Sequence, residues 1–166
     1  MTEVRWGLPW RTPELDAMGK EAFLSGHWHL FDEEERRLLH ESNSLDIFNF
    51  SWTVPPIIQI GIAVDDVRLV GAIGLHREYM PGSYSLIEPM NVHPDYQRKG
   101  LGTRLWNLAA DFCEQAGDKG LKVWALDGNE MAMSFYRDKL NLSVIGKGHW
   151  WLIDHMLPAT GFQLDF

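Results

Sequence analysis

The residues best suited to hold a ligand lie between positions 93 and 103, in the run His-Pro-Asp-Tyr-Gln-Arg-Lys-Gly-Leu-Gly-Thr. This run follows a strand-like stretch and opens a helix-like one. The first backbone N–H groups of a helix have no partner within it, and the helix dipole is positive there, so an anion binds well. Gly100 and Gly102 carry no Cβ that would cover those groups, and Arg98 and Lys99 add positive charge. The spacing therefore predicts a phosphate-binding loop.

Two widespread phosphate-binding motifs do not fit this loop. A P-loop requires Lys followed by Ser or Thr after its last glycine, whereas Gly102 is followed by Thr103 and Arg104. The dinucleotide fingerprint requires three glycines and a later acidic residue. On these residues alone, an ordinary glycine-containing helix start stays open as the alternative.

Together with the preceding Val-His-Pro-Asp-Tyr, the pattern Gln-x-x-Gly-x-Gly at 97–102 resembles the acyl-CoA signature of the GCN5-related N-acetyltransferase (GNAT) family. A second segment of that family, Asn-x-x-Ala-x-x-Phe-Tyr, is matched from Asn129 to Tyr136. The family continues to Gly-Phe, where this chain has Asn141 and Leu142. Asn tolerates the left-handed conformation that ends helices, and Leu can replace Phe in a core. Two signatures in the right order make the resemblance, which covers about 57–153, more specific than either alone.

The resemblance implies acetyl-CoA as co-substrate and no metal. In such proteins the strand before the phosphate loop separates from its neighbour, and the pantetheine arm of CoA pairs with the freed main chain. Pro89 supports this separation independently, because proline cannot donate a ladder hydrogen bond and favours a bulge. By resemblance, the residues expected to bind acetyl-CoA are Met90, Val92, Gln97, Arg98, Lys99, Gly100, Leu101, Gly102, Thr103, Asn129 and Tyr136.

The implied reaction is attack of a neutral amine on a thioester, which is helped by a base and an acid. By resemblance, Tyr136 is expected to protonate the leaving thiolate. The alternative for Tyr136 is an aromatic anchor between helix and sheet. Glu88 is the expected base, since strand alternation puts it on the face of Met90 and Val92. A bulge at Pro89 could turn that face, which leaves an exposed surface carboxylate as the alternative for Glu88.

The remaining patterns predict one domain over residues 1–166, of α/β (α+β) class, with a mixed, mostly antiparallel central sheet flanked by helices. A chain of 166 residues is long enough for one well-buried core and short for two. Helices are predicted at 13–24, 32–40, 101–116 and 132–140, and strands at 57–64, 67–75, 84–92, 121–126 and 143–153, the last with a turn at 146–148.

We therefore predict an N-acetyltransferase that transfers the acetyl group of acetyl-CoA to a primary amine of a small molecule or a protein. The formal net charge of −8 makes nucleic acid an unlikely partner, and an acidic surface would attract a cationic amine, although solubility explains it equally well. Two alternatives stay open: a non-catalytic acyl-CoA-binding module, and a toxin-type acetyltransferase acting on aminoacyl-tRNA. Homodimers are common in the family, but no residue here locates an interface.

Several other features have ordinary interpretations. No run approaches the roughly 20 apolar residues of a membrane span, and the first residues lack a secretion signal, so we expect a cytoplasmic protein. Cys113 is the single cysteine and is expected to be a core thiol. His27 and His29 are expected to be packed or solvated, because no further ligand completes a metal set. His93 is interpreted as a loop-forming residue, and the aromatic stretch 28–52 as core or the wall of an acceptor pocket.

Overall fold

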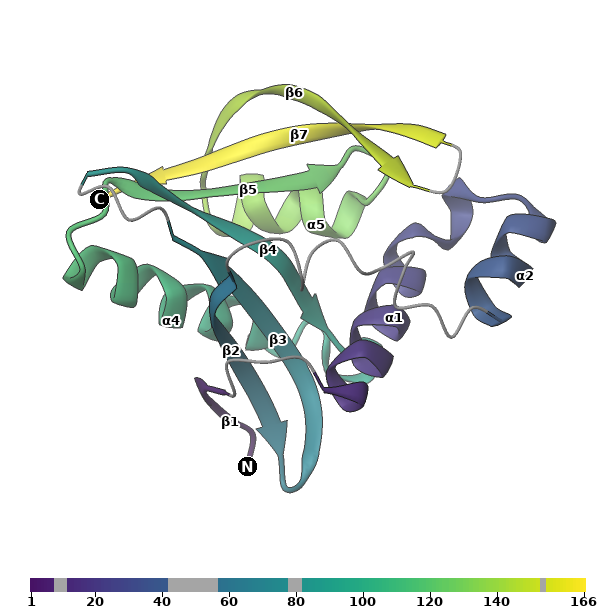
Figure 1. Ribbon diagram of the computed structural model, residues 1–166, viewed down its shortest axis with the longest axis horizontal. Coiled ribbons are helices and arrows are strands. Elements are labelled where there is room, and N and C mark those ends of the chain that lie inside the picture. The colour runs from purple at the N-terminus through teal and green to yellow at the C-terminus, as the bar shows by residue number, and fades with distance from the viewer. Residues whose placement is uncertain (8–11, 42–56, 78–81, 153–154) are drawn as a thin grey trace.

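The computed structural model describes residues 1–7, 12–41, 57–77, 82–152 and 155–166. Its centre is a sheet in the order β1-β2-β3-β4-β5-β7-β6, in which the β4–β5 pair is parallel and the others are antiparallel (Figure 1). The mixed α/β class is confirmed. The strands are β1 (Glu3–Trp6), β2 (Ile57–Asp65), β3 (Arg68–His76), β4 (Tyr84–Val92), β5 (Gly120–Leu126), β6 (Ser143–Leu152) and β7 (His155–Asp165). The helices are α1 (Pro13–His27), η1 (Trp28–Leu30), α2 (Glu33–Glu41), η2 (Pro94–Tyr96), α4 (Leu101–Gln115), α5 (Glu130–Ser134) and the π-helical η3 (Phe135–Lys139).

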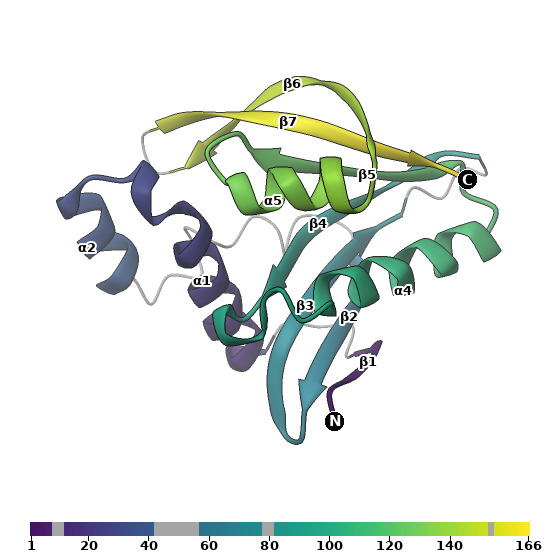
Figure 2. The same ribbon diagram turned by 180° about the vertical axis from the view of Figure 1, so that it is seen from behind.

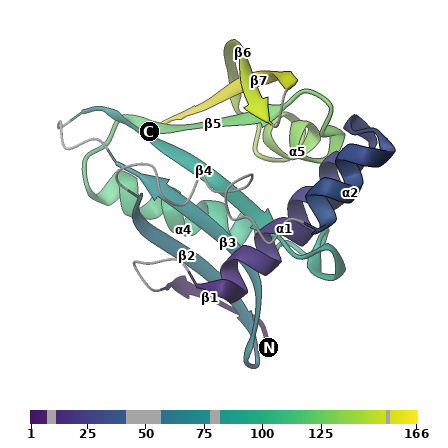
Figure 3. The ribbon, with the colours of Figure 1, turned by 45° about the vertical axis from the view of Figure 1, so that its right-hand side comes forward.

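Helices cover both faces of the sheet. α1 packs on Ala72 of β3, whereas Ile73 of the same strand belongs to the core beneath α4. Because successive strand residues face opposite sides, α1 and α4 lie on opposite faces. α4 and α5 share one face (Figure 2), while α1 and α2 gather at the end of the sheet where β4 finishes (Figure 3). Among the described residues, no helix is long and apolar enough to cross a membrane.

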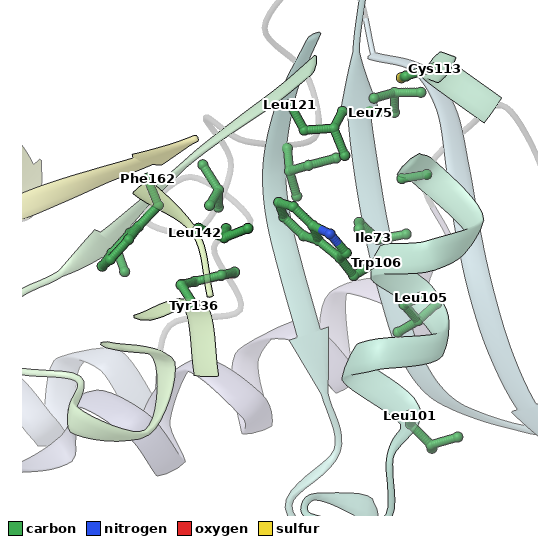
Figure 4. Close-up of a cluster of buried hydrophobic side chains, with 14 of the residues drawn as sticks. Ile73, Leu75, Leu101, Leu105, Trp106, Cys113, Leu121, Tyr136, Leu142 and Phe162 are labelled. Atoms are coloured by element: carbon green, nitrogen blue, oxygen red, sulfur yellow. The ribbon is translucent and has the colours of Figure 1, made fainter. Parts of the chain in front are cut away.

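The main core lies between α4 and the sheet (Figure 4). Leu101, Leu105 and Ala109 are buried, as their helical spacing predicts. Complete burial of one such leucine contributes about 1.5–3 kcal/mol. Cys113 is also buried, and desolvation raises the pKa of its thiol to about 12. The thiol is therefore protonated at neutral pH and is part of the core, as expected.

The bulge predicted at Pro89 is confirmed. Ile73 of β3 pairs with Met90 of β4, and Leu75 pairs with Ile87, so β4 contains one residue more than β3 in this interval. Such an extra residue interrupts the ladder and turns the strand locally. The change of direction falls inside the strand that leads to the glycine-rich loop.

β4 also separates from β5. Their parallel pairing runs from Tyr84 and Gly120 to Ile87 and Val123, and the two strands diverge beyond that point (Figure 3). The bulge begins immediately after Ile87, so it coincides with the start of the divergence. The opening between strands, expected from the family resemblance, is therefore present.

The structure corrects one predicted turn and the end of one helix, and it adds two strands. The turn at 146–148 is wrong, since β6 continues from Ser143 to Leu152 with a bulge between Val144 and Gly146. A Cβ on Gly148 would lie 2.9 Å from the Trp124 ring, so this glycine permits close packing rather than a turn. β1 and β7 were not predicted, although β7 separates β5 from β6 in the sheet. α1 continues past its predicted end at 24 and includes Gly26.

Candidate active site

The glycine-rich loop presents an open helix start. Arg98, Lys99 and Gly100 are exposed, and both Arg98 and Gly100 have positive φ, of 56° and 82°. A Cβ built on Gly100 would meet no atom within 4 Å. Gly100 is the N-cap residue of α4 and has no side chain with which to bond the first N–H groups of the helix. These groups can therefore bind an anion, as the sequence predicts.

The next three residues, Leu101, Gly102 and Thr103, differ in which of their groups a ligand could contact. The side chain of Leu101 is 4% exposed and belongs to the core, so this residue offers a ligand its main chain. A Cβ on Gly102 would lie 3.3 Å from Phe135 and 3.9 Å from Met90, so this glycine lets α4 approach η3 closely. Thr103 is half-buried in the first turn.

The loop is anchored by polar contacts on its other side. The Tyr96 hydroxyl donates a hydrogen bond to Asp65 over 2.9 Å, and Lys99 Nζ lies 4.9 Å from the centre of the Tyr96 ring. His93 is buried, and its Nδ1 accepts a hydrogen bond from the main-chain N–H of Asp95 over 3.2 Å. His93 is thus a loop-forming residue, as interpreted from the sequence.

Gln97 connects the loop to β4 and to α1. Its Nε2 donates to the main-chain oxygen of Val92 over 3.1 Å and lies 3.3 Å from the hydroxyl oxygen of Ser25. Val92 and Met90 are the two residues whose main chain was expected to bind the pantetheine arm. Both lie on the part of β4 that has left β5. Gln97 therefore contacts the strand backbone where that arm was expected to lie.

Glu88 is on a different face of β4 from the one that simple alternation predicts. Ile87 is part of the main core, and Met90 and Val92 pack against that same core. The bulge resets the alternation between Ile87 and Met90, so Glu88, next to Ile87, points to the opposite face. That is the face on which α1 lies. His76 of β3 supports the bulge, with its Nε2 3.1 Å from the main-chain oxygen of Glu88.

The carboxyl group of Glu88 is half-buried, and desolvation raises its pKa to about 7. Such a group is protonated and ionised in similar amounts at neutral pH. A carboxylate of this basicity can take a proton from an ammonium group without being permanently protonated. The position at the start of the strand divergence makes Glu88 a candidate general base.

The raised pKa of Glu88 also makes the free energy of unfolding depend on pH. The folded protein holds this proton up to about pH 7, whereas the ordinary pKa is 4.5, so the carboxyl destabilises the fold progressively as pH rises between these values. We expect Glu88→Gln to be more stable than the wild type by roughly 2–3 kcal/mol at about pH 8, with the gain mostly lost near pH 5. Urea unfolding of both proteins at the two pH values measures this difference. A gain that is equal at both would contradict it.

Tyr136 is buried in η3 with 5% of its surface exposed. The centre of its ring lies 6.0 Å from that of Trp106 and 5.6 Å from that of Phe162, and Figure 4 shows these side chains together. Burial raises the pKa of its hydroxyl above the ordinary value. Tyr136 therefore anchors η3 to the core and carries a proton at neutral pH, which a general acid requires.

Asn129 caps α5, as its place in the sequence predicts. Its Oδ1 accepts a hydrogen bond from the Ala132 N–H over 3.1 Å. Its Nδ2 lies 3.2 Å from Nε2 of His27, and Nε2 of His29 lies 2.8 Å from the main-chain oxygen of Gly128. Both histidines are therefore bonded to protein groups. The described residues contain no cluster of three potential metal ligands.

The aromatic stretch is only partly described. Phe31 is 3% exposed and belongs to a small core with Leu39. Trp28 is 39% exposed, and the guanidinium of Arg36 lies 5.3 Å from the centre of its ring. The other aromatic residues interpreted as core or pocket wall, Phe48, Phe50 and Trp52, lie outside the described residues.

Comparison with known families shows whether the two sequence motifs match the GNAT signatures by chance or by homology. The sequence model of the acetyltransferase (GNAT) family matches residues 23–141, which is more than half of the chain and contains both signatures. The chain belongs to this family. No curated protein matches this GNAT protein in sequence.

Solved structures share the GNAT fold over almost the whole chain. The ribosomal-protein-S18-alanine N-acetyltransferase of Escherichia coli has a TM-score of 0.68 at 16% identity, covering 99% of this chain and 94% of its own. PaiA N-acetyltransferase of Thermoplasma acidophilum, in complex with coenzyme A, has a TM-score of 0.65 at 16% identity, covering 100% and 99%. NAA60 of Arabidopsis thaliana, in complex with acetyl-CoA, has a TM-score of 0.64 at 13% identity, covering 99% and 98%.

The residues present fit acetyl-CoA. Its phosphates require anion-binding groups, and the helix start at Gly100 is open, with exposed Arg98 and Lys99 next to it. Its pantetheine amides require main-chain partners, and β4 beyond Ile87 has left its neighbour β5. The two features are continuous along the chain through the loop at 93–100. They can therefore serve one elongated ligand.

Proposed function

We propose that this GNAT protein is an acetyl-CoA-dependent N-acetyltransferase acting on a primary amine of a small molecule or a protein. One observation carries the proposal: a carboxyl group whose pKa is raised to about 7 lies on β4 at the residue after the last β4–β5 pair. This basicity and this position support the assignment of Glu88 as the general base, at the start of an opening that fits acyl-CoA. The other features of the site support this assignment of roles.

In the proposed complex, the N–H groups at the start of α4 bind the diphosphate, and Arg98 and Lys99 neutralise its charge. The main chain of Met90 and Val92 binds the pantetheine arm. The acetyl-CoA supplies a thioester whose carbonyl carbon accepts a nucleophile. These contacts hold the co-substrate with its acyl end near Glu88, which gives an incoming amine a fixed partner.

Glu88 and Tyr136 perform the proton transfers in this proposal. Glu88 accepts a proton from the ammonium form of the acceptor, so that a neutral amine attacks the thioester. Tyr136 donates its proton to sulfur as the carbon–sulfur bond breaks. The attacking nitrogen, positively charged after the addition, loses its extra proton to the tyrosinate, which gives the neutral amide and returns the tyrosine to its neutral form. No covalent bond to the protein is needed.

The acceptor is proposed only as a class. A primary amine is a cation before it reacts, and the net charge of −8 favours approach of cations. The name of the Escherichia coli relative states that it acts on an alanine of a ribosomal protein. We therefore include protein amino groups with small-molecule amines in the proposal.

Release of free thiol from acetyl-CoA, measured over a panel of amines, amino acids and peptides, tests the proposed function. We expect thiol release that depends on the amine and an acceptor mass increased by one acetyl group. Glu88→Gln should lose this turnover while still binding CoA. CoA binding without turnover of any acceptor would instead support a non-catalytic acyl-CoA-binding module.

A further inference from the structure

The segment at the end of α1, residues 25–29, contacts both sides of the opening between β4 and β5. On the β4 side, Ser25 Oγ lies 3.3 Å from Nε2 of Gln97. On the β5 side, Nε2 of His27 lies 3.2 Å from Nδ2 of Asn129. Nε2 of His29 lies 2.8 Å from the neighbouring Gly128 oxygen. We call residues 25–29 the bridge segment, because it joins the phosphate loop to the turn before α5.

His27 is held in one tautomer by its surroundings. Its Nδ1 lies 2.8 Å from the main-chain oxygen of Phe23, which can only accept, so Nδ1 carries the proton. Nε2 then accepts the hydrogen bond that Nδ2 of Asn129 donates. The ring is 8% exposed, stacks on Phe23 at 4.2 Å, and has a pKa lowered by burial. His27 is therefore a neutral side chain with one bond inside α1 and one to Asn129.

Two glycines permit this close contact. A Cβ on Gly26 would lie 2.7 Å from Nδ2 of Asn129, and a Cβ on Gly128 would lie 2.4 Å from Cδ2 of Leu30. Real Cβ atoms do not approach other atoms so closely, so a side chain at Gly26 would displace the side chain of Asn129, and one at Gly128 would displace that of Leu30. The bridge segment and the turn before α5 are thus fitted to each other in shape as well as in hydrogen bonding.

Asn129, which His27 contacts, is connected through α5 to Tyr136, the proposed acid. Asn129 uses its Oδ1 to cap α5, and α5 continues into η3, which contains Tyr136. We propose that His27 is a positioning residue, which fixes Asn129 and thereby sets α5 and Tyr136 relative to α1 on the opposite face. The proposal rests on the function assigned to Tyr136 above. α1 packs on the face of the sheet that bears Glu88. In this proposal α1 therefore also fixes the position of Tyr136 relative to that face.

Two substitutions separate the two bonds of His27. In His27→Gln the amide oxygen can take the place of Nε2 and accept from Asn129. In His27→Asn the amide can keep the bond to the Phe23 oxygen but does not reach Asn129. Arg36→Ala is the matched control, because Arg36 bonds the Trp28 oxygen of the bridge segment over 2.9 Å and takes no part in the bond between His27 and Asn129.

We expect His27→Asn to reduce kcat about tenfold, with a smaller change in KM for acetyl-CoA, because the acid is displaced rather than the co-substrate site. His27→Gln and Arg36→Ala should stay within about twofold of the wild type. Hydrogen exchange supplies a readout that needs no turnover. The amides of Ala132 and Met133, which bond the side-chain and main-chain oxygens of Asn129, should exchange faster in His27→Asn and at the wild-type rate in His27→Gln.

Equal effects of the Asn and Gln substitutions on kcat and on exchange in α5 would overturn the proposal, since they would show that the bond to Asn129 is not what matters. Faster exchange in His27→Asn together with wild-type kcat would also overturn it, since α5 would then not position the acid. Absence of turnover in the wild type, with CoA binding retained, would instead reject the proposed function itself.

Discussion

Replacement of Glu88 by Gln is expected to reduce kcat/KM for acetyl transfer by about 10²–10⁴-fold, the usual contribution of a positioned base. The amide has nearly the shape of the carboxyl and cannot accept the ammonium proton. The affinity for CoA should stay within about twofold, because Glu88 lies on the face opposite to Met90 and Val92 and outside the phosphate loop. A fall in kcat with retained CoA binding is therefore the expected result.

The pH profile of the wild type tests the same role. Glu88 must be ionised to act as a base, so kcat/KM should rise with pH and level off above an apparent pKa of about 7, the value to which burial raises this carboxyl. The residual kcat/KM of Glu88→Gln should not show this rise with pH. Glu114→Gln, which changes an exposed carboxylate of α4, is the control and should keep it. An unchanged profile in Glu88→Gln would assign the base elsewhere.

Replacement of Tyr136 by Phe is expected to reduce kcat about 10²-fold with little change in KM for acetyl-CoA, since protonation of the leaving sulfur is lost while the ring remains. The ring packs between Trp106 and Phe162, and Phe keeps that packing. The free energy of unfolding should therefore change by less than about 1 kcal/mol.

The second change expected of Tyr136→Phe concerns the leaving group. Thioesters of more acidic thiols need less protonation, so the deficit should shrink when such an acyl donor replaces acetyl-CoA. Tyr84→Phe, which removes a hydroxyl bonded to Asp165 at the other end of β4, is the control. A deficit that stays the same for all donors, or wild-type kcat in Tyr136→Phe, would leave Tyr136 with its anchoring role alone.

Local features of this protein could be predicted from sequence because each depends on a few neighbouring residues. The buried stripe of α4 follows from helical spacing, and the bulge at Pro89 follows from a missing N–H group. The open helix start at Gly100 follows from glycine itself. The loop-forming role of His93 is of the same kind.

Features that depend on distant partners could not be predicted in this way. β7 lies between β5 and β6, and this strand order cannot be inferred from the order of the elements along the chain. Gly148 is typical of a turn in the sequence, and only the structure shows that the Trp124 ring packs on it. The predicted face of Glu88 was wrong, because the prediction continued the alternation of strand residues through the bulge at Pro89. The bond between His27 and Asn129 joins residues 102 positions apart and leaves no local signal.

We propose that the loop at 93–103 and the opening between β4 and β5 bind acyl-CoA. The melting temperature of the protein with acetyl-CoA, with CoA and with ATP tests this binding. A ligand at about 100 times its dissociation constant should stabilise the fold by roughly 2.7 kcal/mol. We expect acetyl-CoA and CoA to raise the melting temperature and ATP to leave it unchanged. If neither acetyl-CoA nor CoA shifts the melting temperature at millimolar concentration, the loop does not bind acyl-CoA and is a structural helix start.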